Sequence, residues 1–145
     1  MNVPDPRILK LVKKHHIFTL ASSVENNPYC ATCFYVFDEN SMRFIFISEK
    51  HTRHISEIEN NNRVAGAIAY ETRLIGVLRG VQFTGNVREL EGSERSSAKK
   101  AYIRRFPVAA PFLKDTPFWA LEADFFKMTD NRLGFGTKLI WYRNS

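Results

Sequence analysis

The densest group of hydrogen-bond donors and cations in the chain is the segment "SEKHTRH" at 48–54, between two apolar segments. The segment follows a strand-like run and precedes a short helical pattern, and Thr52 stands at a plausible N-cap. The first turn of a helix presents unpaired N–H groups and a partial positive charge. A guanidinium, an imidazole and hydroxyls at that point would make an anion cradle, and phosphate matches the guanidinium fork. The alternative is a basic surface loop with an ordinary threonine cap. The residues concerned are Ser48, Lys50, Thr52, Arg53 and His54.

Other chemistry-bearing residues form weaker patterns. His51 and His54 are three apart and could begin a metal site, but no cysteine or carboxylate occupies an obvious third position, so we expect no metal. The chain has no Gly-x-Ser-x-Gly nucleophile motif and no recognisable acid–base pair of carboxylates. Glu57 and Glu59 are interpreted as solvated helix positions.

The two cysteines, Cys30 and Cys33, have the spacing of a redox or zinc motif. A reactive pair usually lies at a helix N-terminus, whereas the flanking aromatic and β-branched residues indicate a strand. Strand positions three apart point to opposite faces, which would separate the thiols. We therefore expect two buried, inert thiols.

The composition suits one soluble domain spanning 1–145, with 44% apolar and 25% charged residues. Twelve phenylalanines favour a sheet-based core over a leucine-rich helical bundle. No apolar run approaches the roughly 20 residues needed to cross a bilayer, and the N-terminus has no signal-peptide pattern. The expected location is the cytoplasm, with no membrane partner.

The net charge of +6 favours anionic partners without choosing among them. One helical segment carries a basic face that could bind nucleic acid. A solvated amphipathic helix explains the same pattern, so nucleic acid is not the expected partner. The basic residues are Lys99, Lys100, Arg104 and Arg105.

Hydrophobic periodicity and turn residues predict an α+β fold with six or seven strands and two or three helices. Strands separated by tight turns indicate antiparallel pairing, and closure into a barrel would remove exposed edges. Gly76, Gly80 and Gly85 suggest bulges or close backbone approaches within one long strand segment. Strands are expected at 17–23, 29–38, 42–48, 63–71, 74–90, 118–130 and 134–143, and helices at 5–15, 52–60 and 92–106.

Three segments resemble the flavin-binding split barrels, whose best-known member is pyridoxamine-phosphate oxidase. "FIFISEKHTRHISEIENNNRVAGAI" resembles that family's strand, phosphate-contact triplet, helix and turn. "LRGVQFTGNVREL" resembles a strand of the family, and "SSAKKAYIRRFP" resembles its helix ending in Tyr-x-x-x-x-Pro. The resemblance covers about 8–106 and is greatest to the small bacterial proteins called YhbP-like.

The resemblance implies an antiparallel split β-barrel that binds FMN at a homodimer interface. It implies that Ser48, Thr52, Arg53 and His54 meet the flavin phosphate. It also implies that Gln82 reaches the flavin, and that the strand from Thr32 to Phe34 passes along the isoalloxazine. Two departures stand out: the segment "CATCFYVF" lacks the oxidase's strand-two cations, and His54 replaces a lysine. The C-terminal third does not match the oxidase's substrate-binding tail, so pyridoxamine-phosphate oxidation is not expected.

The sequence therefore supports an FMN-binding protein, with a flavin-dependent oxidoreductase of unknown small-molecule substrate as the leading hypothesis. No catalytic side chain is singled out. The alternative is a non-enzymatic ligand- or partner-binding dimer on the same fold, with a weakened or lost flavin site.

Overall fold

The computed structural model of the protein describes residues 2–144 and contains one antiparallel sheet of eight strands in that range. The strand order is β2-β1-β5-β6-β7-β4-β3, and β8 pairs with β7. This confirms the expected α+β fold, with one strand more than the sequence predicted. The strands are β1 (Ile17–Val24), β2 (Asn27–Phe34), β3 (Val36–Asp38), β4 (Arg43–Ile47), β5 (Arg63–Tyr70), β6 (Arg79–Leu90), β7 (Phe118–Asp130) and β8 (Lys138–Tyr142).

The sheet curls into a barrel because its two edge strands are neighbours in the sequence. Only Tyr35 separates β2, at one edge of the strand order, from β3, at the other. Tyr35 is fully buried, its backbone N–H donates to the carbonyl of His16 at 2.9 Å, and its hydroxyl donates to the carbonyl of Val12 at 2.6 Å. The sequence predicted one continuous strand over 29–38. The structure divides it, because the chain must pass from one edge of the sheet to the other at Tyr35.

The barrel interior is filled largely by aromatic rings. Phe44 lies at the centre, with its ring centroid 4.4 Å from that of Phe83 and 4.9 Å from that of Phe37. Phe18 and Phe126 complete the cluster, with centroids 5.5 Å and 6.1 Å from Phe44. The phenylalanine-rich composition therefore serves a sheet-based core, as expected.

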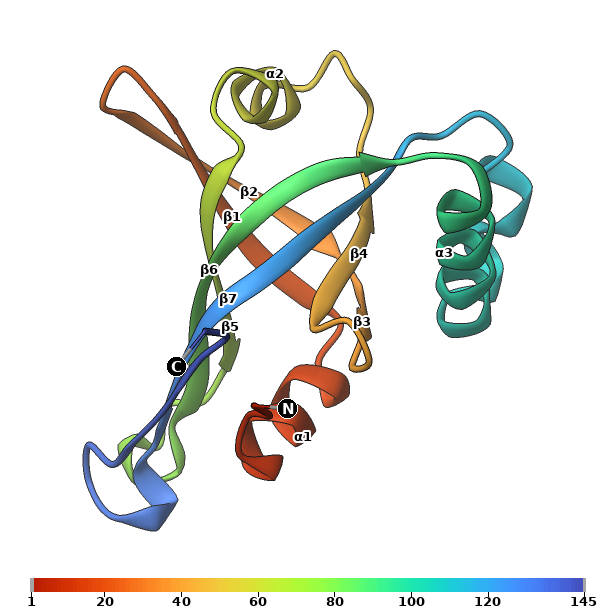
Figure 1. The fold of residues 1–145 in the computed structure, drawn as a ribbon. Coiled ribbons are helices and arrows are strands. Elements are labelled where there is room, and N and C mark those ends of the chain that lie inside the picture. Colours follow the sequence, from red (N-terminus) through yellow and green to blue (C-terminus); the bar gives the residue numbers. More distant parts are fainter. Residues whose placement is uncertain (1, 145) are drawn as a thin grey trace.

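Three α-helices in the described range cover the ends and one side of the barrel (Figure 1). α1 (Pro6–Lys14) and α2 (Arg53–Asn60) bury apolar residues in the interior core at opposite ends. α3 (Gly92–Arg105) packs outside, where Ala98 and Tyr102 join Ile45 and Ala120 in a second core. None of these helices combines the length and apolarity required to cross a membrane.

The long apolar segment at 74–90 contains a short 3-10 helix, Ile75–Val77, before β6 begins. Gly76 therefore lies outside the strand. The register of β6 with β7 shifts between Thr84 and Gly85, which confirms the bulge expected there. A side chain on Gly85 would overlap the carbonyl oxygen of Glu122, so this close backbone approach requires glycine. Two more 3-10 helices, Pro107–Phe112 and Asn131–Leu133, flank β7.

Candidate functional site

The predicted cradle lies where the chain leaves β4 and enters α2. The hydroxyl of Ser48 and Nε2 of His54 form a hydrogen bond across the junction. The carbonyl of Ser48 accepts a 2.9 Å hydrogen bond from Nε1 of Trp119, which anchors the junction to β7. The structure therefore brings together the two ends of the "SEKHTRH" segment, a contact that the sequence did not predict.

Thr52 occupies the N-cap position of α2, as expected, but its side chain does not cap the helix. Its hydroxyl donates to the carbonyl of Glu49 at 2.8 Å. Among residues 2–144, no side chain accepts a capping hydrogen bond at this helix end. The backbone donors of the first turn therefore keep their capacity to bind an anion.

Arg53 is held by its neighbours on α2 and β2. Its Nε donates to a carboxylate oxygen of Glu57 at 2.8 Å, and its guanidinium lies 4.2 Å from the ring centroid of Tyr29. Ser22 donates to the other oxygen of Glu57 at 2.8 Å. The hydrogen bonds from Arg53 and Ser22 lower the pKa of Glu57. The interpretation of Glu57 as a solvated position is wrong, since only 13% of its side chain is exposed.

The other two basic residues of the predicted cradle, His54 and Lys50, add little net positive charge to it. Burial lowers the pKa of His54 below its usual 6.5, although Glu57 opposes this shift, so His54 is mostly neutral at pH 7. Nζ of Lys50 lies 2.9 Å from a carboxylate oxygen of Glu89, near the end of β6. Lys50 is therefore engaged by a residue outside the predicted cradle.

The junction offers a phosphate several hydrogen-bond donors but little net positive charge. The hydrogen bond to Glu57 uses Nε of Arg53, which leaves the terminal guanidinium nitrogens for a ligand. Ser48 and the first turn of α2 supply further donors. However, the charge of Arg53 is balanced by Glu57, and that of Lys50 by Glu89.

The two remaining predicted residues, Thr32 and Gln82, lie on the outer face of the barrel. Both are exposed and belong to one row across four adjacent strands. Thr32 is opposite Thr19, Thr19 is opposite Ala67, and Ala67 is opposite Gln82. Three strand spacings separate Thr32 from Gln82, or about 14 Å. Tyr29, which contacts Arg53, is three positions from Thr32 on β2 and so faces the other side.

The outer face around this row carries small, uncharged side chains. Ala65, Ala67 and Ala69 of β5 are all exposed, and α3 covers the outer face only over the other part of the sheet. Phe34, at the end of β2, is 53% exposed, with its ring centroid 5.5 Å from that of Phe106. We call this surface, formed by β2, β1, β5 and β6, the bare face.

The cysteines follow the predicted alternation but not the predicted burial. Cys33 is buried, and burial raises the pKa of its thiol to about 11. Cys30 is exposed, which corrects the expectation of two buried thiols. Strand alternation placed the two thiols on opposite faces, but it did not reveal that the outer side of β2 is uncovered. Within residues 2–144, no three His, Cys, Asp or Glu side chains gather as a metal site.

Sequence reasoning missed Glu57 and Tyr29 as neighbours of Arg53, and Ser22 as a partner of Glu57. The spacing of Arg53 and Glu57, four residues apart on a helix, was a usable signal for their ion pair. No comparable signal existed for Tyr29 or Ser22, because their approach depends on how α2 sits against β1 and β2.

Comparisons with known proteins identify the family and the fold of the chain. The family model described as pyridoxamine 5'-phosphate oxidase matches residues 4–129. A UPF0306 protein of Yersinia pseudotuberculosis is 41% identical over 145 residues, covering 99% of this chain and 97% of the relative.

Two solved structures share the fold at low identity. A heme-binding protein from Mycobacterium smegmatis has a TM-score of 0.77 at 17% identity, over 92% of this chain and 55% of its own. An FAD-binding protein from Mesorhizobium loti has a TM-score of 0.73 at 12% identity, over 97% and 96%. The chain therefore belongs to the pyridoxamine 5'-phosphate oxidase family and has its split-barrel fold.

Proposed function

We propose that the protein binds FMN and acts as a flavin-dependent oxidoreductase on a small molecule. The observation that carries the proposal is the junction between β4 and α2, where Arg53, Ser48 and an uncapped helix start converge. Family membership supports this proposal, because the junction is the segment that resembles the family's phosphate contact. The bound flavin would supply the redox chemistry, and the protein would supply binding and orientation.

Each part of the junction has a definable task in this proposal. The terminal nitrogens of Arg53 would bind the phosphate while Nε stays on Glu57, so the guanidinium is oriented before the ligand arrives. The ring of Tyr29 would fix the orientation of the Arg53 guanidinium through a cation–π contact. Ser48 would donate to the phosphate once its hydroxyl turns away from His54. The result is orientation of the phosphate with little net charge.

We infer that the functional unit is a homodimer formed through the bare face. Thr32 and Gln82 lie on that face and not at the junction of their own chain. A second copy docked on the bare face would bring its Gln82 toward the flavin site of the first. Small uncharged side chains allow two sheets to pack closely without desolvating charges.

A non-enzymatic binding protein is the second candidate. It is favoured by the charge balance of the junction, where Arg53 and Lys50 both have carboxylate partners. The absence of cations from β2 in the sequence points the same way. In that case the fold would hold another ligand or a partner, and FMN would bind weakly or not at all.

Equilibrium titration with FMN and with riboflavin, followed by flavin fluorescence, tests the proposal. We expect the wild type to bind FMN more tightly than riboflavin. Arg53→Ala should weaken FMN binding at least about tenfold, because a charge-assisted hydrogen bond to phosphate is lost. It should leave riboflavin binding unchanged, since riboflavin has no phosphate. Glu57→Gln should strengthen FMN binding severalfold, because it removes a negative charge beside the phosphate.

Arg7→Ala is the matched control, since Arg7 is equally exposed and also pairs with a carboxylate, that of Asp5. It should change neither affinity. Equal FMN affinity in the wild type and Arg53→Ala would show that the cradle is wrongly assigned. A wild type that binds neither flavin would favour the non-enzymatic candidate.

A further inference from the structure

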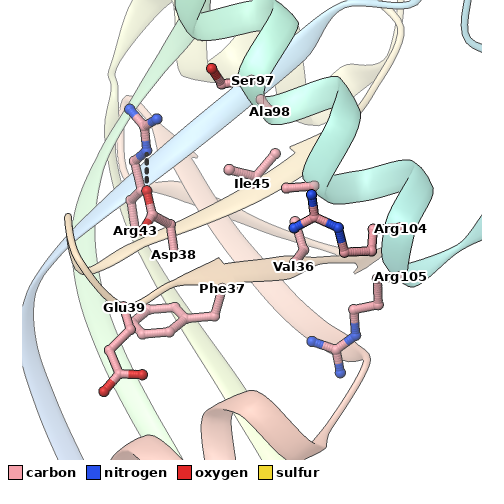
Figure 2. A pocket seen from close by; sticks show the side chains of 11 residues that line it. Val36, Phe37, Asp38, Glu39, Arg43, Ile45, Ser97, Ala98, Arg104 and Arg105 are labelled. Atoms are coloured by element: carbon pink, nitrogen blue, oxygen red, sulfur yellow. Dashed lines mark ion pairs between the residues drawn. The ribbon is translucent and has the colours of Figure 1, made fainter.

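A second concave site lies away from the junction, on the outer side of β3 and β4 and beneath α3 (Figure 2). Its volume is about 350 Å³, which falls in the range of small-molecule sites. Its apolar wall includes Val36 and Ile45 from the sheet and Ala98 and Ala101 from the helix. We call this space the α3 cleft. It is large enough for one or two rings and too small for a macromolecule.

The acidic end of the α3 cleft is already neutralised. Glu39 pairs with Lys13 at 2.7 Å. Asp38 forms an ion pair with Arg43 at 3.6 Å, drawn in Figure 2, and Arg43 also donates to Glu94 at 3.1 Å. These carboxylates therefore have cations of their own and need no basic ligand.

The helical end carries two guanidinium groups without an acidic partner. Figure 2 shows Arg104 and Arg105 on the α3 side of the cleft. Arg105 is half-buried, donates to the carbonyl of His15, and lies 5.5 Å from the ring centroid of Tyr35. Burial lowers the pKa of Arg105. Neither arginine forms an ion pair with a carboxylate within residues 2–144. Those that do include Arg7, Arg43, Arg53, Arg63, Arg88 and Arg132.

A partly buried cation without a counter-ion is unfavourable, so a ligand that supplies the missing charge gains binding energy there. The ligand must also cover the apolar wall, which favours a ring over a hydrated inorganic anion. Guanidinium groups also stack on aromatic planes, so the two arginines can contact both the negative group and the ring of such a ligand.

We propose that the α3 cleft binds a small aromatic anion, with its ring on Val36, Ile45 and Ala101 and its carboxylate or phosphate on Arg104 and Arg105. The site is separate from the junction and its occupation does not depend on flavin. Aryl carboxylates and aryl phosphate monoesters both combine a ring with a negative group. Their relative affinities for the α3 cleft show which of these two ligand classes it prefers.

Amide-resolved NMR titration of the whole protein with benzoate, 2-naphthoate and phenyl phosphate tests this proposal. We expect saturable shifts in 36–39 and 97–105 for at least one of these anions. Benzylamine, which reverses the charge on a similar ring, should produce none. Arg104→Ala should weaken the best ligand about tenfold, as expected for loss of one charge-assisted hydrogen bond. Arg104 is exposed, and within 2–144 its side chain forms no hydrogen bond or ion pair, so this variant should fold normally.

Two further variants separate the cleft from general surface charge. Ala101→Leu fills the cleft without changing charge and should also weaken binding. Lys100→Ala removes an exposed cation from the same helix outside the cleft and should not. The proposal is overturned if none of the three anions gives saturable shifts, if benzylamine binds equally well, or if Lys100→Ala weakens binding as much as Arg104→Ala. Unchanged binding in Ala101→Leu would also overturn it.

Discussion

Gly66 and Ala67 are neighbours on β5 but face opposite sides of the barrel wall. Gly66 points inward, where an added methyl group would overlap the ring of Phe83. Ala67 points outward and is exposed. The same strand thus meets a filled aromatic interior on one side and a bare surface on the other. The interior accounts for the stability of the barrel, whereas the middle of the bare face carries small uncharged side chains such as Ala65 and Ala67, as a surface that receives a partner would.

The largest expected effect is on the interior. Phe44→Ala should lower the free energy of unfolding by about 3–5 kcal/mol, because Phe44 contacts five other aromatic rings at the centre of the barrel. Urea denaturation measures this change. Phe34→Ala, on the bare face, should cost less than about 1 kcal/mol in the same measurement, because Phe34 is already 53% exposed. Similar losses in both variants would remove the distinction between the two faces.

A charge introduced on the bare face should weaken association of two copies of the chain. Ala67→Glu should weaken the proposed homodimer at least about a hundredfold, because an unpaired carboxylate would be buried in the interface. Sedimentation equilibrium gives the dissociation constant. Ala110→Glu, at an exposed position outside the bare face, is the control and should leave it unchanged. A wild type that stays monomeric at high concentration would contradict the role given to this face.

The neighbouring pair on β5 gives the sharpest comparison. Gly66→Ala should destabilise the fold by about 1–3 kcal/mol, since the Phe83 ring is stacked on Phe44 and cannot move freely. Ala67→Ser, one residue further along, should stay within about 0.5 kcal/mol. Thermal or urea unfolding of both variants tests the assignment of their faces. A neutral Gly66→Ala would mean that the interior is looser than its ring distances indicate.

The smallest effect concerns the rim of the barrel, where His54 is half-buried. Burial lowers its pKa, so the unfolded chain takes up the proton first as pH falls. The contribution of neutral His54 to stability should be complete above about pH 6.5 and decrease as pH falls below it. The pKa values of His15 and His16 are also lowered by burial, with the same sign. Melting temperatures between pH 7 and 5 measure the slope, and His54→Gln should reduce it. An unchanged slope in that variant would show that His54 does not contribute.

Local patterns predicted much of the fold because they depend on nearby residues. The limits of β7 agree with the sequence-based range, and those of β1, β4, β5 and α2 lie within one residue of it. Periodicity and turn residues determine such limits. The division of the second strand at Tyr35 could not be read in this way, because it results from closure of the whole sheet. The same holds for Cys30, whose exposure depends on which part of the outer face α3 covers.

The candidate site was predictable in composition but not in pairing. The strand end near Ser48 and the helix start near Thr52 were predicted, whereas the hydrogen bond between Ser48 and His54 was not. The pairing of Lys50 with Glu89 joins residues 39 positions apart, and only the folded sheet brings them together. The inward turn of Arg105 to His15 likewise crosses most of the chain. Charge patterns therefore identified the cations, while the fold decided which of them stayed without a partner.

The length of the turn between β1 and β2 determines which side chains of β2 point into the barrel and which point outward. Glu25 and Asn26 form a two-residue connection with positive φ angles of 52° and 65°, and Val24 pairs directly with Asn27. Because strand side chains alternate, inserting one residue into β2 would turn the positions beyond it over. Cys33 would then meet solvent, and Thr32 would enter the aromatic interior. Insertions and deletions should therefore be tolerated far less in this hairpin than substitutions, and the spacing of its residues constrains the chain more tightly than their chemistry.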